Sequence, residues 1–329
     1  MKAAVLSSPA DVFTRPLKIS ERPLPSPPPS HVLLQVRACG VCRTDLHIVE
    51  GELPPRRREV IPGHQIVGEV VNGTPTLPAG SRVGVSWIGG TDGRCWYCRN
   101  HMENLCDAPT FTGYAVDGGY AEYVSAREDF VFPLPSSLDD LHAAPLLCAG
   151  IIGFRSLRVA GVERRERVGL FGFGASAHLA LPVLQAWGCE VYVSTRGEKH
   201  RRLASEMGAT WVGSETDKPP IALDRAITFA PSGDVVVAAL GSLRKGGVVA
   251  INAIHLDRVP EFDYDSLLWG ERQLRSVANM TRSDAADFLD LAAEIGLKPQ
   301  VTVFPLDQAN EALAAVKRDS INGAAVLVM

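Results

Sequence analysis

Apolar residues follow two different patterns along the chain, and the change occurs near residue 150. Before that point, short valine-rich runs alternate with proline and glycine; they are Val32–Val36, Ile66–Val71 and Arg82–Ser86. Runs of this length, separated by turn-forming residues, are typical of short β-strands. We therefore predict that residues 1–149 are mostly β-structure, beginning with a strand at the N-terminus.

Beyond residue 150, strand-length and helix-length segments alternate. The predicted strands are Arg167–Phe171, Glu190–Ser194, Ala226–Phe229 and Val248–Ala253, and the predicted helices are Ala175–Trp187 and Glu198–Met207. This alternation is typical of a doubly wound parallel sheet in an α/β fold. Another amphipathic helix is predicted over 283–296, with Ser283 as its N-cap and Gly296 as the glycine that ends it.

Composition narrows the class of protein. The 329 residues are enough for two domains, and the formal net charge of −4 argues against nucleic acid as a partner. No apolar run approaches the ~20 residues of a membrane span, and the apolar start, 1–6, is too short for a signal peptide. The seven cysteines fall mostly in metal-type spacings. We expect a cytoplasmic protein that makes no membrane contact and uses thiolate ligands rather than disulfides.

Three residues far apart in the sequence have contexts that suggest a catalytic zinc. Cys42 lies in Ala-Cys-Gly-Val-Cys-Arg-Thr-Asp-Leu-His, His64 in Ile-Pro-Gly-His-Gln and Cys148 in Ala-Pro-Leu-Leu-Cys-Ala-Gly. Three protein ligands that leave the fourth position to water or substrate are the arrangement of a catalytic zinc. Such a metal polarises a carbonyl oxygen.

A glycine loop follows the first strand of the second pattern. Gly172-Phe-Gly174-Ala175-Ser176-Ala177 fits G-x-G-x-x-A between a strand and a helix. The small residues allow the backbone to approach a pyrophosphate at the helix N-terminus, so we predict dinucleotide binding. A mere tight turn is the alternative.

The end of the next strand bears on the choice of cofactor. Ser194, Thr195 and Arg196 stand where an NAD enzyme usually carries a carboxylate for the ribose hydroxyl. Hydroxyls and a guanidinium could instead bind a 2′-phosphate. We therefore expect NADP(H) to be favoured over NAD(H), although a solvated arginine with NAD bound through backbone groups is possible.

Several motifs together resemble the zinc-dependent medium-chain alcohol dehydrogenases, especially the bacterial type. They are Ala38–His47, Pro62–His64, Ala144–Gly150, a cysteine lobe at 92–106, the glycine loop at 172–177 and the stretch 267–279. The resemblance covers essentially the whole chain. It implies a β-rich, GroES-like catalytic domain formed by 1–149 and 283–329, which the strand Ala324–Met329 rejoins, and a Rossmann domain at 150–282.

The resemblance also implies roles for residues near Cys42. Cys42 rather than Cys39 is the zinc ligand, and Cys39 is a small buried residue. Thr44 would relay the alcohol proton and His47 would pass it onward to solvent through the cofactor ribose, although His47 could be an ordinary surface histidine. Asp45 would orient His64 by accepting its other N–H. Arg43 would contact the pyrophosphate, unless it is an ordinary surface arginine.

Two positions depart from the family's pattern. Gln65 stands where glutamate commonly follows the ligand histidine, so the zinc should be more electrophilic. The family's second, structural zinc uses four cysteines, and here Asp92 replaces the first of them, giving a predicted site of Asp92, Cys95, Cys98 and Cys106. His101 is a rival fourth ligand, and a weakly held or empty site is the other alternative. Two zinc ions per chain are expected.

The predicted substrate is a small aliphatic or aromatic alcohol or aldehyde. Trp87 matches an aromatic wall of the pocket in related bacterial enzymes, and further candidates for that pocket are Phe111, Leu147 and Ile254. We find no basic cluster in the catalytic half that would indicate an acidic or phosphorylated substrate, so we expect an uncharged one. Relatives are dimers or tetramers, so a homo-oligomer is expected.

Two other functions remain open from the sequence. One is a zinc-free quinone or enoyl reductase on the same fold. The other is a catalytically silent protein that binds zinc and nucleotide, for instance a redox sensor that uses 92–106.

Overall fold

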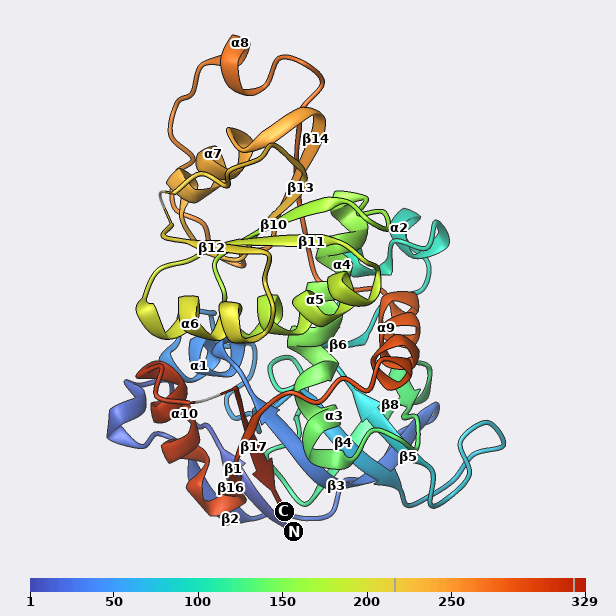
Figure 1. Cartoon of the computed structure of the whole chain (residues 1–329). Coiled ribbons are helices and arrows are strands. Elements are labelled where there is room, and N and C mark those ends of the chain that lie inside the picture. The colour runs from blue at the N-terminus through green and yellow to red at the C-terminus, as the bar shows by residue number, and fades with distance from the viewer. Residues whose placement is uncertain (216, 322) are drawn as a thin grey trace. The chain divides into compact units, whose positions relative to one another are not determined.

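The computed structural model describes residues 1–329 except 216 and 322, and it divides into two compact units (Figure 1). The first unit is Met1–Cys148 with Thr281–Met329, and the second is Ala149–Met280. These boundaries lie one and two residues before the predicted ones. Each unit is described below by itself.

The first unit is built on a seven-stranded sheet centred on the long strand β3 (His31–Val41). β3 pairs antiparallel with β4 (Gln65–Val70), with β8 (Tyr123–Arg127) and with β17 (Ala324–Val328). The C-terminal strand therefore rejoins the β-rich part, as predicted. The other strands and α-helices of the first unit are β1 Lys2–Val5, β2 Lys18–Glu21, β5 Arg82–Val85, β6 Ile88–Gly90, β7 Thr110–Phe111, β9 Val131–Pro133, β16 Val301–Pro305, α1 Arg43–Glu50, α2 Trp96–Arg99, α3 Asp140–Pro145, α9 Arg282–Glu294 and α10 Ala309–Lys317.

The core of this unit comes from the alternating and continuous apolar runs seen in the sequence. Leu34 and Val36 on β3, Ile66 on β4, Val83 on β5 and Leu327 on β17 are all buried in one cluster. Their burial fixes the register of the strands, because a shift by one residue would turn each side chain to the opposite face.

The second unit contains a six-stranded parallel sheet in the order β12-β11-β10-β13-β14-β15. The order reverses beside β10, which is the switch point where doubly wound sheets bind ligands. The doubly wound prediction is confirmed. The elements are β10 Arg167–Phe171, β11 Glu190–Ser194, β12 Trp211–Gly213, β13 Leu223–Thr228, β14 Leu243–Ile251, β15 Gln273–Ser276, α4 Ile151–Ala160, α5 Ala175–Ala186, α6 Glu198–Glu206, α7 Gly233–Leu240 and α8 Tyr264–Leu267.

The predicted N-cap of the helix near 283–296 is wrong. Helix α9 is capped by Thr281, whose hydroxyl accepts from the Asp284 backbone N–H at 3.1 Å, while the Asp284 carboxylate accepts from the Thr281 N–H at 2.8 Å. This reciprocal capping box places Ser283 inside the helix. Gly296 follows the C-cap with φ +64°, as the prediction required.

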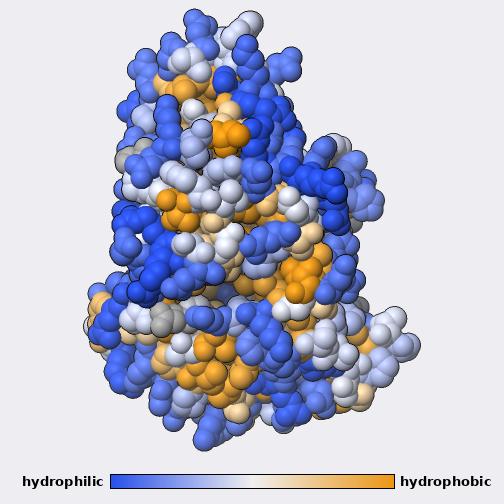
Figure 2. Space-filling view, in the orientation of Figure 1, coloured by the Kyte–Doolittle hydropathy of each residue, from blue (hydrophilic) through white to orange (hydrophobic). Residues whose placement is uncertain are grey.

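The segment Asp140–Ala160 is the one helical stretch, among the described residues, that is long and apolar enough to cross a membrane by those criteria alone. However, 67% of its most apolar window is buried inside the protein, which is also true of ordinary core helices. On the face shown in Figure 2, apolar residues lie in separate patches among hydrophilic ones.

Candidate active site

Cys42, His64 and Cys148 converge in the first unit, with their ligand atoms all within 4.8 Å of one another. Cys42 is the N-cap of α1, immediately after β3. His64 immediately precedes β4, and the pairing of Gly40 with Gln65 places both residues at the same end of the β3–β4 ladder. Cys148 lies in a single π-helical turn, Leu146–Gly150, that follows α3. Such turns are frequent at functional sites.

Asp45 connects two of these three residues. Its Oδ2 accepts from the Cys42 backbone N–H at 2.9 Å, and its Oδ1 accepts from the Gly63 N–H at 3.2 Å. The same Oδ1 lies 3.1 Å from His64 Nδ1, and Asp45 is fully buried. His64 Nε2 lies 3.3 Å from Cys42 Sγ. With Nδ1 bound to a carboxylate, Nε2 is the nitrogen directed at the sulfurs, which is the usual arrangement of a metal-ligating histidine.

Only glycine fits at position 63, because of its backbone conformation and its close neighbours. Its φ of +96° lies in the left-handed region, and a Cβ there would collide with the Tyr120 ring and with Cys39 Sγ. Cys39 itself is fully buried between Gly63 and Gly119 and lies outside the three-donor cluster. The close approach of this loop to β3 therefore depends on glycine and a small thiol.

The electrostatics of the cluster favour a bound cation. A hydrogen bond with Cys148 lowers the pKa of Cys42 well below its ordinary value, against the effect of burial, and nearby His64 lowers it further. The same hydrogen bond, with burial, raises the pKa of Cys148. Burial alone would lower the pKa of His64, but the charges of Asp45 and Cys42 raise it well above its ordinary value. Two sulfurs and one imidazole that release protons on metal binding fit a catalytic zinc.

The residues expected to move the proton lie on α1. Thr44 is buried in its first turn, and Arg43 is exposed beside it. His47 is 20% exposed, and its Nδ1 lies 2.5 Å from Glu52 Oε2. Glu52 was not predicted from the sequence. Its position five residues after His47, just beyond the end of α1, was the only signal for it.

Aromatic rings stand beside His64. Trp87 meets the imidazole edge-on at 5.1 Å and stacks with Phe111 at 4.8 Å and with Tyr114 at 6.0 Å between ring centroids. Tyr114 was not predicted as part of this aromatic wall, although its position three residues after Phe111 could have suggested it. Leu147, a candidate for the substrate pocket, is a core residue that is fully buried against Gly84. Ile254 belongs to the second unit and is 65% exposed.

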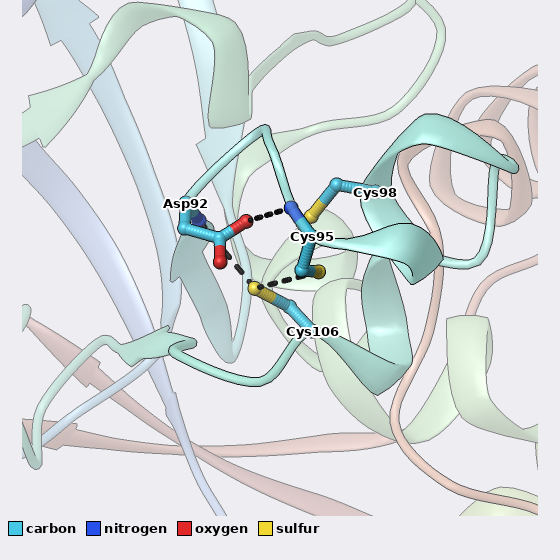
Figure 3. Close-up of side chains that lie close together, drawn as sticks. All are labelled: Asp92, Cys95, Cys98 and Cys106. Atoms are coloured by element: carbon cyan, nitrogen blue, oxygen red, sulfur yellow. Dashed lines mark hydrogen bonds between the residues drawn. The ribbon is translucent and has the colours of Figure 1, made fainter.

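A second cluster of donors lies in the cysteine lobe, where Asp92, Cys95, Cys98 and Cys106 also have ligand atoms within 4.8 Å of one another (Figure 3). Asp92 Oδ1 accepts from the backbone N–H groups of Arg94 and Cys95 at 2.9 and 3.0 Å. Cys106 Sγ accepts from the Asp92 N–H at 3.4 Å and lies 3.9 Å from Cys95 Sγ. Three sulfurs and one carboxylate oxygen fit a closed structural zinc site.

Backbone hydrogen bonds hold the Asp92 carboxylate in its ionised form. Donation from the Cys95 and Arg94 N–H groups lowers the pKa of Asp92, whereas burial raises the pKa of Cys98 to about 12. His101, the rival ligand, is exposed with φ +58° and lies outside the cluster. The four donors therefore include the predicted aspartate.

The glycine loop stands at the switch point of the parallel sheet. Gly172 follows β10 with φ +91°, and a Cβ there would press on the Ala230 backbone. Helix α5 begins at Ala175, so Ala175, Ser176 and Ala177 form its first turn after Gly174. Free N–H groups of such a turn can receive a pyrophosphate.

The three residues at the end of β11 differ in their availability. Ser194 is 1% exposed and its hydroxyl donates to the Asp217 carbonyl oxygen at 3.4 Å. Thr195 is also buried. The Arg196 side chain is 84% exposed, with Glu215 at 3.8 Å. Arg196 is therefore the member of this set whose charge is accessible to a cofactor phosphate.

Comparison with known proteins agrees with this geometry. Residues 28–136 match the model of the alcohol dehydrogenase GroES-like domain. The chain is 45% identical to a protein of Mycobacterium tuberculosis (strain CDC 1551 / Oshkosh) described as "Probable alcohol dehydrogenase AdhA", over 100% of this chain and 97% of that one. The chain belongs to the zinc-dependent medium-chain alcohol dehydrogenase family. Its function is that of an alcohol dehydrogenase, and the comparisons favour neither alternative function.

Two solved structures are similar over the whole chain. Acetophenone reductase from Geotrichum candidum, in complex with NAD, is 26% identical with a TM-score of 0.85, over 100% of this chain and 97% of that one. A Helicobacter pylori protein described as CAD, complexed with NADP(H), is 22% identical with a TM-score of 0.86, over 100% and 99%. The fold class is confirmed, and this fold accommodates either cofactor.

Proposed function

We propose that this alcohol dehydrogenase uses a zinc ion held by Cys42, His64 and Cys148. The convergence of these three donors, with Asp45 bound to the ligand histidine, carries the proposal. When bound there, zinc supplies a Lewis acid that polarises the oxygen of the substrate. The rings of Trp87 and its stacked neighbours provide an apolar wall suited to small aliphatic or aromatic alcohols and aldehydes.

The cofactor is proposed to bind at the glycine loop, with NADP(H) favoured over NAD(H). When bound, this cofactor would supply the hydride donor or acceptor for the carbonyl or carbinol carbon of the substrate. Gly172, Gly174 and the first turn of α5 would receive the pyrophosphate. Arg196 would pair with the 2′-phosphate, and Thr195 and Ser194 would shape the ribose site. Arg43 is proposed to add a second positive charge to the pyrophosphate.

The chain's own groups would move the proton. Thr44 Oγ1 would accept the proton of the substrate hydroxyl while releasing its own proton to the cofactor ribose, and His47 would pass a proton from the ribose towards solvent. Because Glu52 Oε2 faces His47 Nδ1, the carboxylate would hold the imidazole ring in one orientation. The buried position of Thr44 and the partial exposure of His47 suit an inner and an outer member of such a path.

Gln65 is proposed to leave the zinc more electrophilic than a glutamate would. Its side chain is 2% exposed and packs against Gly40, where there is no room for a Cβ. A neutral amide at this place removes one negative charge from the surroundings of the metal.

A second zinc, held by Asp92, Cys95, Cys98 and Cys106, is proposed to be structural, giving two ions per chain. The free cysteines are consistent with a cytoplasmic protein. A homo-oligomer, dimer or tetramer, is expected from the family alone.

One experiment tests the cofactor and the reaction together. Initial rates of benzaldehyde reduction are measured with NADPH and with NADH for the wild type, for Arg196→Ala and for Arg164→Ala, an exposed arginine in another turn of the same unit. We expect the wild type to prefer NADPH and Arg196→Ala alone to lose about 10- to 100-fold of that preference, the range of a charge-assisted hydrogen bond. A wild-type preference for NADH would remove the 2′-phosphate assignment, and no turnover with either would contradict the substrate class.

A further inference from the structure

A cavity of about 250 Å³ lies in the first unit between the N-terminal segment and the loop that follows α1. The two segments are joined by mutual backbone hydrogen bonds between Leu6 and Val60, at 2.9 and 3.0 Å. One wall is the segment from Leu6 to Pro9, and the other carries Pro55, Arg56, Arg57 and Arg58; Ile48, Leu53, Val60 and Tyr114 complete the lining. The basic run 56–58 was not recognised from the sequence.

The positive charge of this pocket is only partly neutralised. Arg57 Nη1 pairs with Asp117 Oδ1 at 3.0 Å, whereas Arg56 lies over the Tyr114 ring at 5.4 Å. Within the part of the chain that the structure describes, no carboxylate lies within 4.0 Å of the Arg56 or Arg58 guanidinium, and none lines the cavity.

Glu59, the residue after Arg58, has its hydrogen bond and ion pair with other residues, although the charge of Arg58 also acts on it. Glu59 accepts from the Ser7 hydroxyl at 2.8 Å and pairs with Arg22 at 3.1 Å. It is not among the lining residues. Two guanidinium groups and the Ser8 hydroxyl therefore remain to interact with an anion that enters the cavity.

The pocket shares a residue with the wall beside the zinc ligands. Tyr114 lines the cavity, and its ring stacks with Trp87, which meets His64 edge-on. The Tyr114 hydroxyl donates to the Pro54 carbonyl oxygen at 2.6 Å, which fixes the ring to the arginine-bearing loop. Tyr114 therefore joins the aromatic wall beside His64 to the arginine-bearing loop.

We propose that this pocket binds the carboxylate at the distal end of the substrate, so that the enzyme prefers ω-carboxyaldehydes and the corresponding alcohols over their neutral analogues. This inference rests on the proposed function. Arginine presents a planar fork of donors that matches a carboxylate, and its charge is permanent at any pH the protein survives. The expectation of an uncharged substrate is thereby replaced by one of an acidic substrate.

The test compares an unbranched series of ω-carboxyaldehydes of increasing length with the neutral n-alkanals. For each length, the ratio of kcat/KM for the charged over the neutral aldehyde is measured in the wild type, in Arg56→Gln/Arg58→Gln and in Arg164→Gln/Arg165→Gln. The last pair changes the net charge equally at an exposed turn of the second unit. Binding of inorganic phosphate and of glutarate to all three proteins is measured by calorimetry, which needs no turnover.

We expect the ratio to exceed one at some length in the wild type and to fall about 10- to 100-fold in Arg56→Gln/Arg58→Gln, mainly through KM, with no change in the control. Turnover of the neutral aldehydes without any preference for a carboxylate would overturn the inference while leaving the proposed function intact. Phosphate binding that requires Arg56 and Arg58, with an unchanged ratio, would indicate a site for a free anion and would also overturn it. If no aldehyde is turned over, the proposed function fails, and absent glutarate binding then refutes the pocket separately.

Discussion

The two candidate metal clusters of this enzyme are built in opposite ways. The Cys42–His64–Cys148 cluster gathers residues from three distant segments, and both His64 and Asp45 beside it are fully buried. The Asp92–Cys106 cluster comes from a single stretch of fifteen residues, and three of its four donors are partly exposed. The first depends on the fold of the whole unit, whereas the second depends on a local turn.

This difference indicates what each metal contributes. The buried cluster has three donors and adjoins an aromatic wall, so a position remains for substrate. The lobe has four donors and its backbone N–H groups already satisfy the sulfur of Cys106 and one oxygen of Asp92. We therefore expect loss of the first metal to abolish turnover and loss of the second to affect stability.

The largest effect is expected at Cys148. Cys148→Ser should lower kcat/KM for benzaldehyde by at least about a thousandfold, since a Lewis acid contributes several kcal/mol to such reactions. Metal analysis should show one zinc lost per chain, with the unfolding midpoint less affected. Cys189→Ser, a free cysteine of the second unit, is the matched control. Unchanged turnover in Cys148→Ser would refute the zinc site.

A smaller loss is expected when the carboxylate behind His64 is neutralised. Asp45→Asn keeps the size of the side chain but removes the charge that holds His64 Nδ1–H, so activity and affinity for the catalytic zinc should fall about 10- to 100-fold. Both are measured on the same preparation, by initial rates and by zinc titration. Asp290→Asn, at an exposed position of α9, is the control. Wild-type zinc affinity in Asp45→Asn would show that the contact does not support the metal.

Substitutions of Asp92 in the cysteine lobe should change the rate of zinc release rather than the rate of turnover. Asp92→Cys restores a fourth thiolate and should slow zinc loss to a chelator about tenfold or more, because thiolate suits zinc better than carboxylate oxygen. Asp92→Ala should speed it. Zinc release is followed with a chromogenic chelator while turnover is recorded in parallel. Equal release rates in all three proteins would mean that Asp92 is not a ligand.

The smallest effect is expected at Asp224, a carboxylate outside both metal clusters. Because Asp224 holds no metal, its effect on stability in acid can be told apart from the effect of losing zinc. Burial would raise the pKa of Asp224, but hydrogen bonds from Arg244 and from the Arg167 backbone and side chain outweigh it and lower the pKa. A lowered folded pKa means that the stabilisation is present above the unfolded pKa of ~3.9 and is lost as pH falls through the folded value.

The corresponding test substitutes Asp224 by Asn. The free energy of unfolding should fall by about 1–2 kcal/mol at neutral pH, and the difference from the wild type should shrink in strong acid. Denaturant titration at several pH values gives both numbers. A difference that is independent of pH down to strong acid would show that the charge of Asp224 plays no part.

Much of the fold could be predicted from the sequence, and individual elements show the physical reasons. β10 and β11 have the predicted bounds because central parallel strands are continuous apolar runs. The N-cap of α9 was misplaced because Thr281 and Ser283 are both good capping residues, and only the side chain of Asp284 selects between them.

The residues of the site could be predicted from the sequence, but the hydrogen bonds that position them could not. The donors of both clusters have recognisable sequence contexts, whereas the role of Asp45 in holding Gly63 and Cys42 depends on backbone geometry. The basic run 56–58 was visible in the sequence but overlooked, whereas the opposite wall of the pocket, near Leu6, is brought to it only by the tertiary structure.

Metal titration shows whether turnover depends on a metal held by the buried cluster. The enzyme is stripped with a chelator, and benzaldehyde reduction with NADPH is measured as zinc is returned in steps, with zinc per chain determined at each step. Activity should vanish on stripping and return in proportion to the zinc bound by the Cys42–His64–Cys148 site. Full activity of the folded, zinc-free protein would contradict it.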